Sequence, residues 1–473
     1  MVRYGAICNT RGVKINIMKV LLFGTGEYYN RYKIWFKNEE IIALVDNSIE
    51  KQGKHLDGKN VISPVQIVNY EYDAVFVMSF YIKDIKKQLL SLGVKEDKIY
   101  HFYDIPDLIA YQNIKEDIKI YRSSFFDESK KDVLVLNQDL TLGGPALALF
   151  QAAKILKKHG RKVTYASQID GPLKHLIEKE EIEVIVDQNL LVETMNECGW
   201  ISGYSQIICN TINFHIFLSK RDTSIPMIWW LHDALFFYDG VYKKAINEIS
   251  RENLKIWAVG PVSEKAIKTF RPDFLVEDLL YGVVDSCGVR TLEEDRKTIN
   301  FITIGYIEER KGQDVLLKAI KMLPEAMLQK THFCFVGRNT SLLAKRIMDE
   351  AQNIKEIEFM GLVDRAKINE LLKESDVLIC PSREDPMPTV CAEAMMHSVP
   401  CIISDAAGTT KYISDMQNGM IFRNEDENNL LEKIEWAIDN KSMIRNMGVE
   451  ARTLFENIFS MDVFEKKLVE LLM

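Results

Sequence analysis

The sequence predicts an α/β fold made of repeated strand–helix units with parallel sheets. Short apolar runs recur along the chain, and each is followed by a helical pattern and a turn. This alternation is typical of domains built on a parallel sheet. The length of 473 residues corresponds to about three domains of roughly 150 residues each. We therefore expect three Rossmann-like domains rather than one large core.

Two polar, charge-rich stretches, at 113–132 and 286–298, divide the predicted strands into three groups. The first group lies at 19–23, 41–45 and 74–78, and the second lies at 133–137, 163–166, 207–210, 227–231 and 256–259. The third group lies at 301–304, 332–336, 357–359, 377–380 and 401–404. Because a new buried strand follows each polar stretch, we expect domains at residues 1–120, 121–286 and 287–473.

The composition excludes several classes of protein. The formal net charge of −8 gives no general attraction to nucleic acid, so we expect no nucleic-acid partner. The longest strongly apolar run, 225–238, is interrupted by His232 and Asp233 and is shorter than the ~20 residues of a membrane-spanning helix. The eight cysteines form no C-x-x-C pair, which indicates reduced thiols. Residues 1–17 lack the apolar core of a signal peptide, so we expect a cytoplasmic protein.

The first domain opens with a strand that runs into a glycine turn, Gly24-Thr-Gly26, and Asp46 ends the next strand. This pattern is a dinucleotide-binding fingerprint without its third glycine, whose position is held by Tyr29. One interpretation is a nucleotide or sugar-nucleotide site formed by Gly24, Gly26 and Asp46. The alternative is a Rossmann-like module that keeps these glycines only for its turn. The pattern leaves both interpretations open.

The middle domain carries two candidate features after its strands. Gly143 and Gly144 join a strand to a helix, where exposed N–H groups and the helix dipole can hold a phosphate, although the same residues also suit a plain turn. His232 follows the strand at 227–231, at the edge of a parallel sheet where ligands commonly bind. A single histidine is more often a core residue than a catalyst, so its assignment needs support from other motifs.

The third domain begins with a strand that ends at Gly305 and leads to Arg310-Lys311-Gly312 at the start of a helix. Two fixed cations beside a helix N-terminus suit a diphosphate, because Arg forks onto phosphate oxygens and Lys acts as a point charge. Together they can offset the charge of a leaving nucleoside diphosphate without a metal ion. Taken alone, an Arg-Lys pair is more often a solvated turn.

The strongest signal lies at 381–395, directly after the buried strand at 377–380. Pro388 suits the first position of a helix, which places Asp385 in a loop and Glu393 inside the helix. If the whole segment between the two acids were helical, they would lie ~12 Å apart along the axis, farther than a glycosidase acid–base pair at ~5 to 9 Å. We therefore expect the two acids to bind different parts of one long ligand; otherwise they are ordinary surface carboxylates.

Together these motifs resemble the family 4 glycosyltransferases of the GT-B fold, and the likeness covers about residues 130–473. In the resemblance Glu393 matches the acid that binds the donor ribose, and Asp385 matches the acid, usually Glu, that binds the donor sugar. Arg310 and Lys311 correspond to the diphosphate-binding turn, and His232 to the histidine near the transferred sugar and the acceptor. The implied catalytic residues are His232, Asp385, Lys311 and Arg310. The implied donor-binding residues are Gly143, Gly144, Gly305, Arg310, Lys311, Glu384, Asp385, Met387, Pro388, Thr389 and Glu393.

The resemblance implies a retaining, metal-independent, hexosyltransferase-type enzyme that takes a UDP- or GDP-sugar and requires no cofactor. It makes 121–286 the acceptor domain and 287–473 the donor domain, preceded by an accessory domain. The chain has no Asp-x-Asp motif, with which the GT-A class holds a divalent cation. The acceptor would be a hydroxyl of a glycan, a lipid-linked molecule or a protein, in bacterial surface glycan assembly. A low-activity scaffold that binds nucleotide sugars is the alternative, because Asp385 replaces Glu and Tyr306 replaces a frequent Arg.

Two features outside these motifs carry further expectations. A basic cluster follows the glycine pair, at Lys154, Lys157, Lys158, His159, Arg161 and Lys162. It is either a solvated helix end or a surface for peripheral contact with the anionic inner face of a membrane. The last helix, 463–472, is expected either to stay with the third domain or to cross back to the middle domain.

Overall fold

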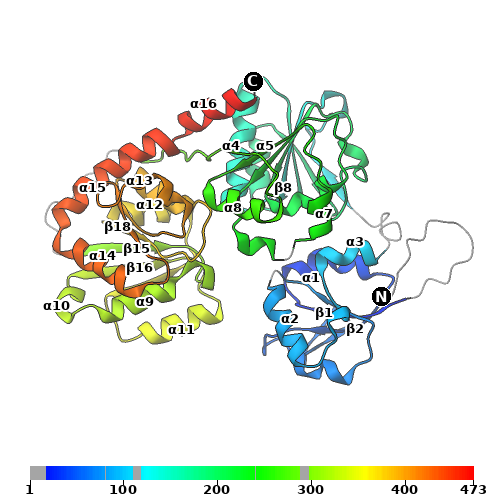
Figure 1. The fold of residues 1–473 in the computed structure, drawn as a ribbon, viewed down its shortest axis with the longest axis horizontal. Coiled ribbons are helices and arrows are strands. Elements are labelled where there is room, and N and C mark those ends of the chain that lie inside the picture. Colours follow the sequence, from blue (N-terminus) through cyan, green and yellow to red (C-terminus); the bar gives the residue numbers. More distant parts are fainter. Residues whose placement is uncertain (1–16, 80, 110–118, 240, 288–297, 473) are drawn as a thin grey trace, which may run out of the picture. The chain divides into compact units, whose positions relative to one another are not determined.

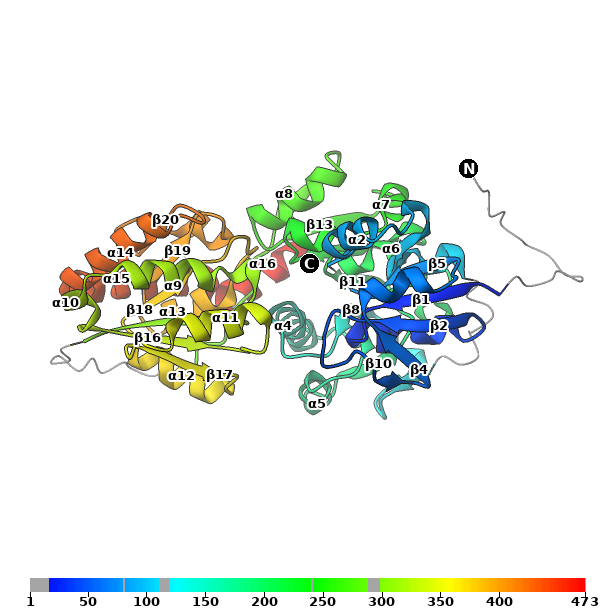
Figure 2. The same ribbon diagram turned by 90° about the horizontal axis from the view of Figure 1, so that it is seen from below.

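The computed structural model describes residues 17–79, 81–109, 119–239, 241–287 and 298–472. Across these ranges the chain forms three sheets flanked by helices, so the predicted α/β class is confirmed (Figure 1 and Figure 2). Residues 1–16, which include Cys8, lie outside the described residues, as do parts of both polar stretches. The chain divides into two compact units, Met1–Lys119 with Asp239–Tyr242, and Ile120–Tyr238 with Lys243–Met473.

The first unit holds a six-stranded sheet in the order β3-β4-β2-β1-β5-β6. Its strands are β1 Lys19–Phe23, β2 Glu40–Val45, β3 His55–Leu56, β4 Lys59–Ile62, β5 Ala74–Val77 and β6 Ile99–His101. Its helices are α1 Glu27–Tyr32, α2 Ile82–Ser91 and α3 Ile105–Leu108. The strands pair in parallel except for β3 with β4. The apolar runs of β1 and β5 lie at the centre because both faces of a parallel sheet are covered.

The middle sheet, in the second unit, has eight strands in the order β14-β13-β12-β11-β8-β9-β10-β7. Its strands are β7 Ile120–Arg122, β8 Val133–Asp139, β9 Val163–Ile169, β10 Glu183–Asp187, β11 Gln206–Asn210, β12 Met227–Leu231, β13 Leu254–Ala258 and β14 Val276–Asp278. Its helices are α4 Gly144–Lys158, α5 Leu173–Lys179, α6 His215–Ser219, α7 Lys243–Glu248 and α8 Pro261–Phe270. Only the edge strand β7 is antiparallel to its neighbour in the described residues.

The third sheet has six parallel strands in the order β17-β16-β15-β18-β19-β20. Its strands are β15 Ile299–Ile304, β16 Thr331–Val336, β17 Ile357–Gly361, β18 Val377–Cys380, β19 Cys401–Ser404 and β20 Gly419–Phe422. The helices that follow them are α9 Gln313–Met322, α10 Glu325–Leu328, α11 Leu342–Ala351, α12 Arg365–Glu374, α13 Thr389–Met396, α14 Glu427–Asp439, α15 Lys441–Leu454 and α16 Met461–Leu472. The loops at the carboxyl edge of this sheet carry the strongest sequence motif.

The middle and third sheets share one hydrophobic core inside the second unit. The last helix, α16, contributes to it by packing on α4 of the middle domain, and Figure 1 shows the two helices meeting. Phe464 stacks on Trp230 with the ring centroids 5.8 Å apart. Glu465 pairs with Lys158 at 2.7 Å. The carboxyl edges of the two sheets are therefore held within one compact body.

Two properties of the chain concern its environment. Among the described residues no helix combines the length and the apolar character needed to cross a lipid bilayer. The cysteines of the described part are free thiols, and all of them except Cys287 are buried. Four of them, Cys334, Cys380, Cys391 and Cys401, lie in the hydrophobic core of the second unit, where thiols serve as small hydrophobic side chains.

Candidate active site

The loop at residues 381–388, called here the 381–388 loop, joins β18 to α13 at the carboxyl edge of the third sheet. Pro388 is the N-cap of α13 and has an extended ψ of 115°, so the helix begins at Thr389. The prediction that Pro388 is the first helical residue is therefore wrong by one position. Asp385 therefore lies in the loop, and Glu393 lies within α13.

Two glycines allow other segments to approach this loop closely. A Cβ atom at Gly408 would overlap the carbonyl oxygen of Pro386, and a Cβ atom at Gly312 would overlap that of Pro381. Gly312 also has a left-handed φ of 67°, which other residues adopt only with strain. The Arg310-Lys311-Gly312 turn therefore packs directly on the start of the 381–388 loop.

The two cations of that turn meet the first acid of the motif. Lys311 Nζ lies 2.6 Å from Oδ2 of the buried Asp385, and Arg310 Nη1 lies 3.6 Å from the same oxygen. The hydroxyl of Ser382 lies 3.5 Å from it. The Lys311 side chain also passes close to Gly305, because its carbons would lie 3.7 Å, an ordinary van der Waals distance, from a Cβ at that position. The residues expected to bind a diphosphate and a sugar thus form one compact cluster.

Glu393 is buried on α13 and has an unusual electrostatic environment. One carboxylate oxygen pairs with the half-exposed Arg365 at the start of α12, and the other, Oε2, is buried with no hydrogen-bond partner among the described residues. Burial raises the pKa of Glu393, and Arg365 opposes only part of that effect. A buried carboxylate oxygen without a donor is a group that a ligand hydroxyl can satisfy.

A cavity of about 300 Å³ lies beside Glu393 and is lined by residues of both domains of the second unit. Gly144 and Leu142 contribute from the middle domain, and Thr389 and Arg365 contribute from the third. A Cβ atom at Gly144 would lie 3.5 Å from Cγ2 of Thr389, so the glycine brings the start of α4 next to the start of α13. The cavity is thus bounded by two helix N-termini.

The predicted glycine pair begins α4. Gly143 is its N-cap, with an extended ψ of 160°, and Gly144 is its first residue. Asp139 stabilises the approach to the helix by accepting from the N–H of Thr141 at 3.0 Å and from its hydroxyl at 2.6 Å. The N-terminus of this fifteen-residue helix provides free backbone donors of the kind that bind anions.

His232 directly follows β12, as predicted. Its ring packs on Trp230 at a centroid distance of 4.5 Å, and its Nε2 is buried without a hydrogen-bond partner in the described part of the chain. Burial lowers the pKa of His232 to about 3, so the ring is neutral near pH 7. The neighbouring Asp233 is buried as well and accepts from the N–H of Ile212 at 2.6 Å. A neutral imidazole can exchange a hydrogen bond with a sugar hydroxyl without carrying a charge.

Three other predicted donor residues, Met387, Glu384 and Thr389, have different surroundings. Met387 is buried, and its carbonyl accepts from the hydroxyl of Tyr281 at 2.9 Å. Glu384 directs its carboxylate at the backbone of Leu235, 2.9 Å away, rather than at Arg310 or Lys311. Thr389 lines the cavity beside Glu393. The structure therefore places Thr389 at the cavity, whereas the carbonyl of Met387 is bonded to Tyr281 and the carboxylate of Glu384 is engaged elsewhere.

The residues of the candidate nucleotide site in the first domain make contacts within that domain. Asp46 Oδ1 accepts from the N–H of Ser48 at 2.9 Å, and Oδ2 accepts from the N–H of Thr25 at 3.0 Å and from Lys51 at 3.1 Å. A Cβ at Gly24 would lie 2.9 Å from a backbone oxygen of Met78, so this glycine is required for packing. Gly26 caps a helix of only six residues. These contacts favour the alternative, a turn that keeps its glycines for structural reasons.

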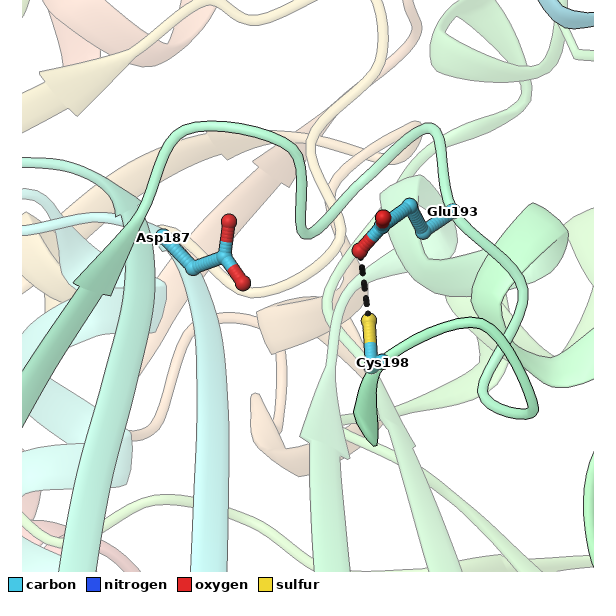
Figure 3. Close-up of side chains that lie close together, drawn as sticks. All are labelled: Asp187, Glu193 and Cys198. Carbon is cyan, nitrogen blue, oxygen red and sulfur yellow. Dashed lines mark hydrogen bonds between the residues drawn. The ribbon is translucent and has the colours of Figure 1, made fainter. Parts of the chain in front are cut away.

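One further group of side chains, at the end of β10, could offer ligands to a metal ion. Figure 3 shows Asp187, Glu193 and Cys198, whose ligand atoms lie within 4.8 Å of one another. The Cys198 thiol donates to Glu193 at 3.0 Å, and Asp187 accepts from the indole of Trp200 at 2.7 Å and from the N–H of Asn189 at 3.0 Å. Burial raises the pKa of the thiol, which opposes the thiolate form that binds metals. Internal hydrogen bonds account for this group, so we assign no ion to it.

The basic cluster at the end of α4 contacts acidic residues of the second unit. The ion pairs are Lys154–Glu180, Lys157–Glu181, Lys158–Glu465 and Arg161–Asp132, and Nε2 of His159 lies 2.9 Å from the carboxylate of Glu465. These pairs offset much of the local positive charge that a membrane surface would need. They favour the interpretation of the cluster as a solvated helix end.

Sequence reasoning missed several residues of the site. Arg365 pairs with Glu393 across 28 positions, and Tyr281 bonds to Met387 across 106 positions. The local sequence around Arg365 or Tyr281 does not predict these contacts, because each contact depends on how separate elements pack. The only available signal was the N-cap Asp364, which marks the start of a helix immediately before Arg365.

Family models match each part of the chain. The model described as Glycosyl-transferase family 4 matches residues 129–272, and the model described as Glycosyl transferases group 1 matches residues 290–454. A third model, described as C2185-like, N-terminal, matches residues 16–100. The two glycosyltransferase models together cover most of the second unit, including the glycine pair, His232, the cation turn and the 381–388 loop.

Individual relatives share parts of the sequence. An uncharacterized 41.2 kDa protein in the cps region of Klebsiella pneumoniae is 31% identical over 163 residues, 33% of this chain and 43% of that protein. CapM of Staphylococcus aureus, a capsular polysaccharide biosynthesis glycosyltransferase, is 23% identical over 180 residues, 36% of this chain and 45% of that protein. For three of the curated relatives the alignment spans 42% to 64% of their own length.

Solved structures share the fold. The structure of Anabaena Alr3699/HepE in complex with UDP covers 72% of this chain and 99% of its own, with 19% identity and a TM-score of 0.62. WaaG, a glycosyltransferase involved in lipopolysaccharide biosynthesis, covers 72% and 99%, with 13% identity and a TM-score of 0.55. The predicted GT-B fold with an additional N-terminal sheet domain is confirmed. Residues 129–454 thus resemble the family 4 glycosyltransferases in sequence, and the second unit has their GT-B fold.

Proposed function

We propose that this protein is a retaining glycosyltransferase that moves a hexose from a nucleotide-sugar donor to a hydroxyl of an acceptor. The observation that carries this proposal is the contact of Lys311 with Asp385 at 2.6 Å. It joins a cation suited to a diphosphate with an acid suited to sugar hydroxyls, on the same edge of the sheet as the cavity beside Glu393. One extended ligand would span these groups.

In this proposal the donor lies along the third domain. Its ribose would bind to Glu393, whose Oε2 has no partner in the described residues, and its diphosphate would bind to Arg310, Lys311 and the N-terminus of α4 at Gly143 and Gly144. We expect a UDP-sugar ahead of a GDP-sugar, because the Anabaena structure of the same fold contains UDP. Gly305, Met387, Pro388 and Thr389 would shape the site.

The chemical step we propose proceeds on one face of the sugar. The bond from the anomeric carbon to the β-phosphate oxygen breaks, and a bond to the acceptor oxygen forms on the same side. The acceptor proton passes to the departing phosphate oxygen. Arg310 and Lys311 stabilise the negative charge on that phosphate, which removes the need for a metal ion, while Asp385 and His232 orient the sugar ring.

The acceptor would bind to the middle domain, beside His232. A glycan of a capsule-type polysaccharide is the acceptor class we favour, because CapM is described as a capsular polysaccharide biosynthesis enzyme. A lipid-linked acceptor would bring the protein to the inner face of the cytoplasmic membrane, and a protein acceptor would not. The ion-paired basic cluster on α4 gives no separate support for membrane contact.

A second candidate is a scaffold that binds nucleotide sugars with little turnover. It is favoured by one observation: Asp385 and Glu393 both contact cations, Lys311 and Arg365, which a donor would have to displace or share. A screen of UDP- and GDP-sugars for nucleoside diphosphate release, with and without glycan and lipid-linked acceptors, separates the two candidates. Release that depends on the acceptor supports the transferase, and tight binding without release supports the scaffold.

A further inference from the structure

Glu384 makes a contact that links the two domains of the second unit. Its carboxylate accepts from the N–H of Leu235 at 2.9 Å and from the N–H of Phe236 at 3.2 Å. These residues begin the short 3₁₀ helix η10, Leu235–Tyr238, in which the first internal bond is donated by Phe237 to Ala234. The first N–H groups of a helix have no partner inside it, so Glu384 caps this helix from another domain.

The backbone that carries Glu384 is held firmly by its neighbours. Arg383 donates to both carboxylate oxygens of Asp314, at 2.8 and 2.7 Å, and also contacts Glu425 at 2.6 Å. Burial of the neighbouring Asp385 against Lys311 fixes the other side. Glu384 therefore projects from a fixed part of the 381–388 loop. Its contact with η10 holds this helix of the middle domain in place relative to the loop.

Arg310 touches both sides of this contact. Its Nη1 donates to the backbone oxygen of Glu384 at 3.2 Å, and its guanidinium lies 5.7 Å from the ring centroid of Phe237. Phe237 belongs to the same helix that Glu384 caps. Arg310 thus stabilises both the 381–388 loop and the capped helix η10.

We propose that Glu384 is a positioning residue that holds residues 232–238 of the middle domain against the 381–388 loop, rather than a ligand of the donor. His232 lies at one end of the held segment and Asp385 is adjacent to Glu384, so the contact sets the distance between these two side chains. The role rests on the proposed function to the extent that His232 and Asp385 face one sugar. The contact itself does not depend on that function.

Hydrogen exchange of the full-length protein tests the contact directly. In Glu384→Ala, exchange of the amides in a peptide covering 234–238 should become at least about 10-fold faster, because their acceptor is removed. Glu384→Gln should give an intermediate rate, since one amide oxygen remains to accept while the NH₂ group cannot. Glu252→Ala removes an exposed carboxylate from a turn of the middle domain and is the matched control.

Calorimetric titration with UDP and with GDP distinguishes a positioning role from donor binding. We expect the nucleotide affinity of Glu384→Ala and Glu384→Gln to change less than about 3-fold. In turnover assays kcat should fall and the acceptor KM should rise, whereas the donor KM should stay within about 3-fold. Partial recovery of kcat in Glu384→Gln relative to Glu384→Ala would support the graded loss of the two hydrogen bonds.

The proposal is overturned if exchange at 234–238 is unchanged in both Glu384 variants. It is equally overturned if UDP or GDP affinity falls 10-fold or more without faster exchange, because Glu384 would then be a donor ligand. If the wild-type protein binds neither nucleotide and releases none from any sugar, the proposed function fails. In that case the exchange measurement still decides whether Glu384 holds the 232–238 segment.

Discussion

Two carboxylates of the third domain, on Asp385 and Glu393, each lie beside a cation. Sequence reasoning identified both acids and Lys311 because they belong to compact motifs with a recognisable spacing. It did not identify Arg365, since the pairing partner of Glu393 depends on the packing of α12 against α13. The acids and cations of a compact motif can therefore be identified from the sequence. The charged partner that each of them contacts depends on the tertiary structure.

Replacement of Glu393 by Ala should raise the KM for the nucleotide sugar by about 10- to 100-fold, because a charged hydrogen bond of ~1.5–3 kcal/mol to the ribose would be lost. We expect kcat to change much less. Steady-state kinetics with the preferred donor measures both constants, and Glu393→Gln, which preserves shape and one acceptor, is the matched control. A variant with a reduced kcat and an unchanged KM would contradict the ribose assignment.

The buried Asp233 predicts a specific dependence of stability on pH. Burial raises the pKa of its carboxyl to about 7, against a usual value near 4. The folded state therefore binds a proton that the unfolded state has lost, so this group destabilises the fold as the pH rises from about 4 to about 7. The resulting loss in the free energy of unfolding is complete above about pH 7 and absent below about pH 4.

Asp233→Asn keeps an acceptor for the N–H of Ile212 and removes the titration. The free energy of unfolding of this variant, relative to the wild type, should increase by about 2–4 kcal/mol between about pH 4 and pH 7.5. Urea unfolding at a series of pH values measures the difference. A difference that stays constant with pH would show that Asp233 does not titrate in this range in the folded protein.

At the scale of elements, most of the buried apolar strands were predictable, and several short strands, among them β3 and β7, were not. The strand β18 and the first four residues of β8 are continuous apolar runs, since both faces of these strands are buried. The edge strands β3 and β7 are short and exposed, so no apolar run marks them. The start of α13 was misplaced by one residue because Pro388 suits both the cap and the first helical position.

The close packing of the 381–388 loop predicts that Gly408 tolerates no side chain. In Gly408→Ala the new Cβ would overlap the carbonyl oxygen of Pro386, so the loop that carries Asp385 would have to move. We expect a loss of about 1–3 kcal/mol in the free energy of unfolding together with lower turnover. Gly199→Ala, at a position with no atom within 4 Å of a new Cβ, is the control and should stay within about 0.5 kcal/mol. Equal stability of the two variants would contradict the packing argument.

At the scale of the whole molecule, the candidate site belongs entirely to the second unit. Its residues lie in Ile120–Tyr238 and Lys243–Met473, and the sheet of the first unit has a core of its own. The sequence predicted three Rossmann-like sheets because the apolar runs come in three groups. The sequence left open whether the last helix stays with the third domain or crosses back to the middle domain. In the structure α16 packs on α4, and the middle and third domains share one core.

Residues 120–473 expressed alone should therefore bind UDP with the affinity of the full-length chain, to within about 3-fold. The physical reason is that the cation turn, the 381–388 loop, α4 and Glu393 are all retained. Calorimetric titration of both proteins, with circular dichroism to establish folding, makes the comparison. A folded second unit that has lost nucleotide binding would show that the first domain contributes to the site.

The proposed reaction requires Lys311 and Arg310 to stabilise a departing nucleoside diphosphate at the edge of the third sheet. The most direct measurement is the rate of UDP release from UDP-sugars, in the presence of a glycan or lipid-linked acceptor, for the wild type and for Lys311→Ala. We expect acceptor-dependent release by the wild type and a kcat about 100- to 1000-fold lower in the variant, with a smaller change in donor KM. Equal kcat values for the two proteins would contradict the account.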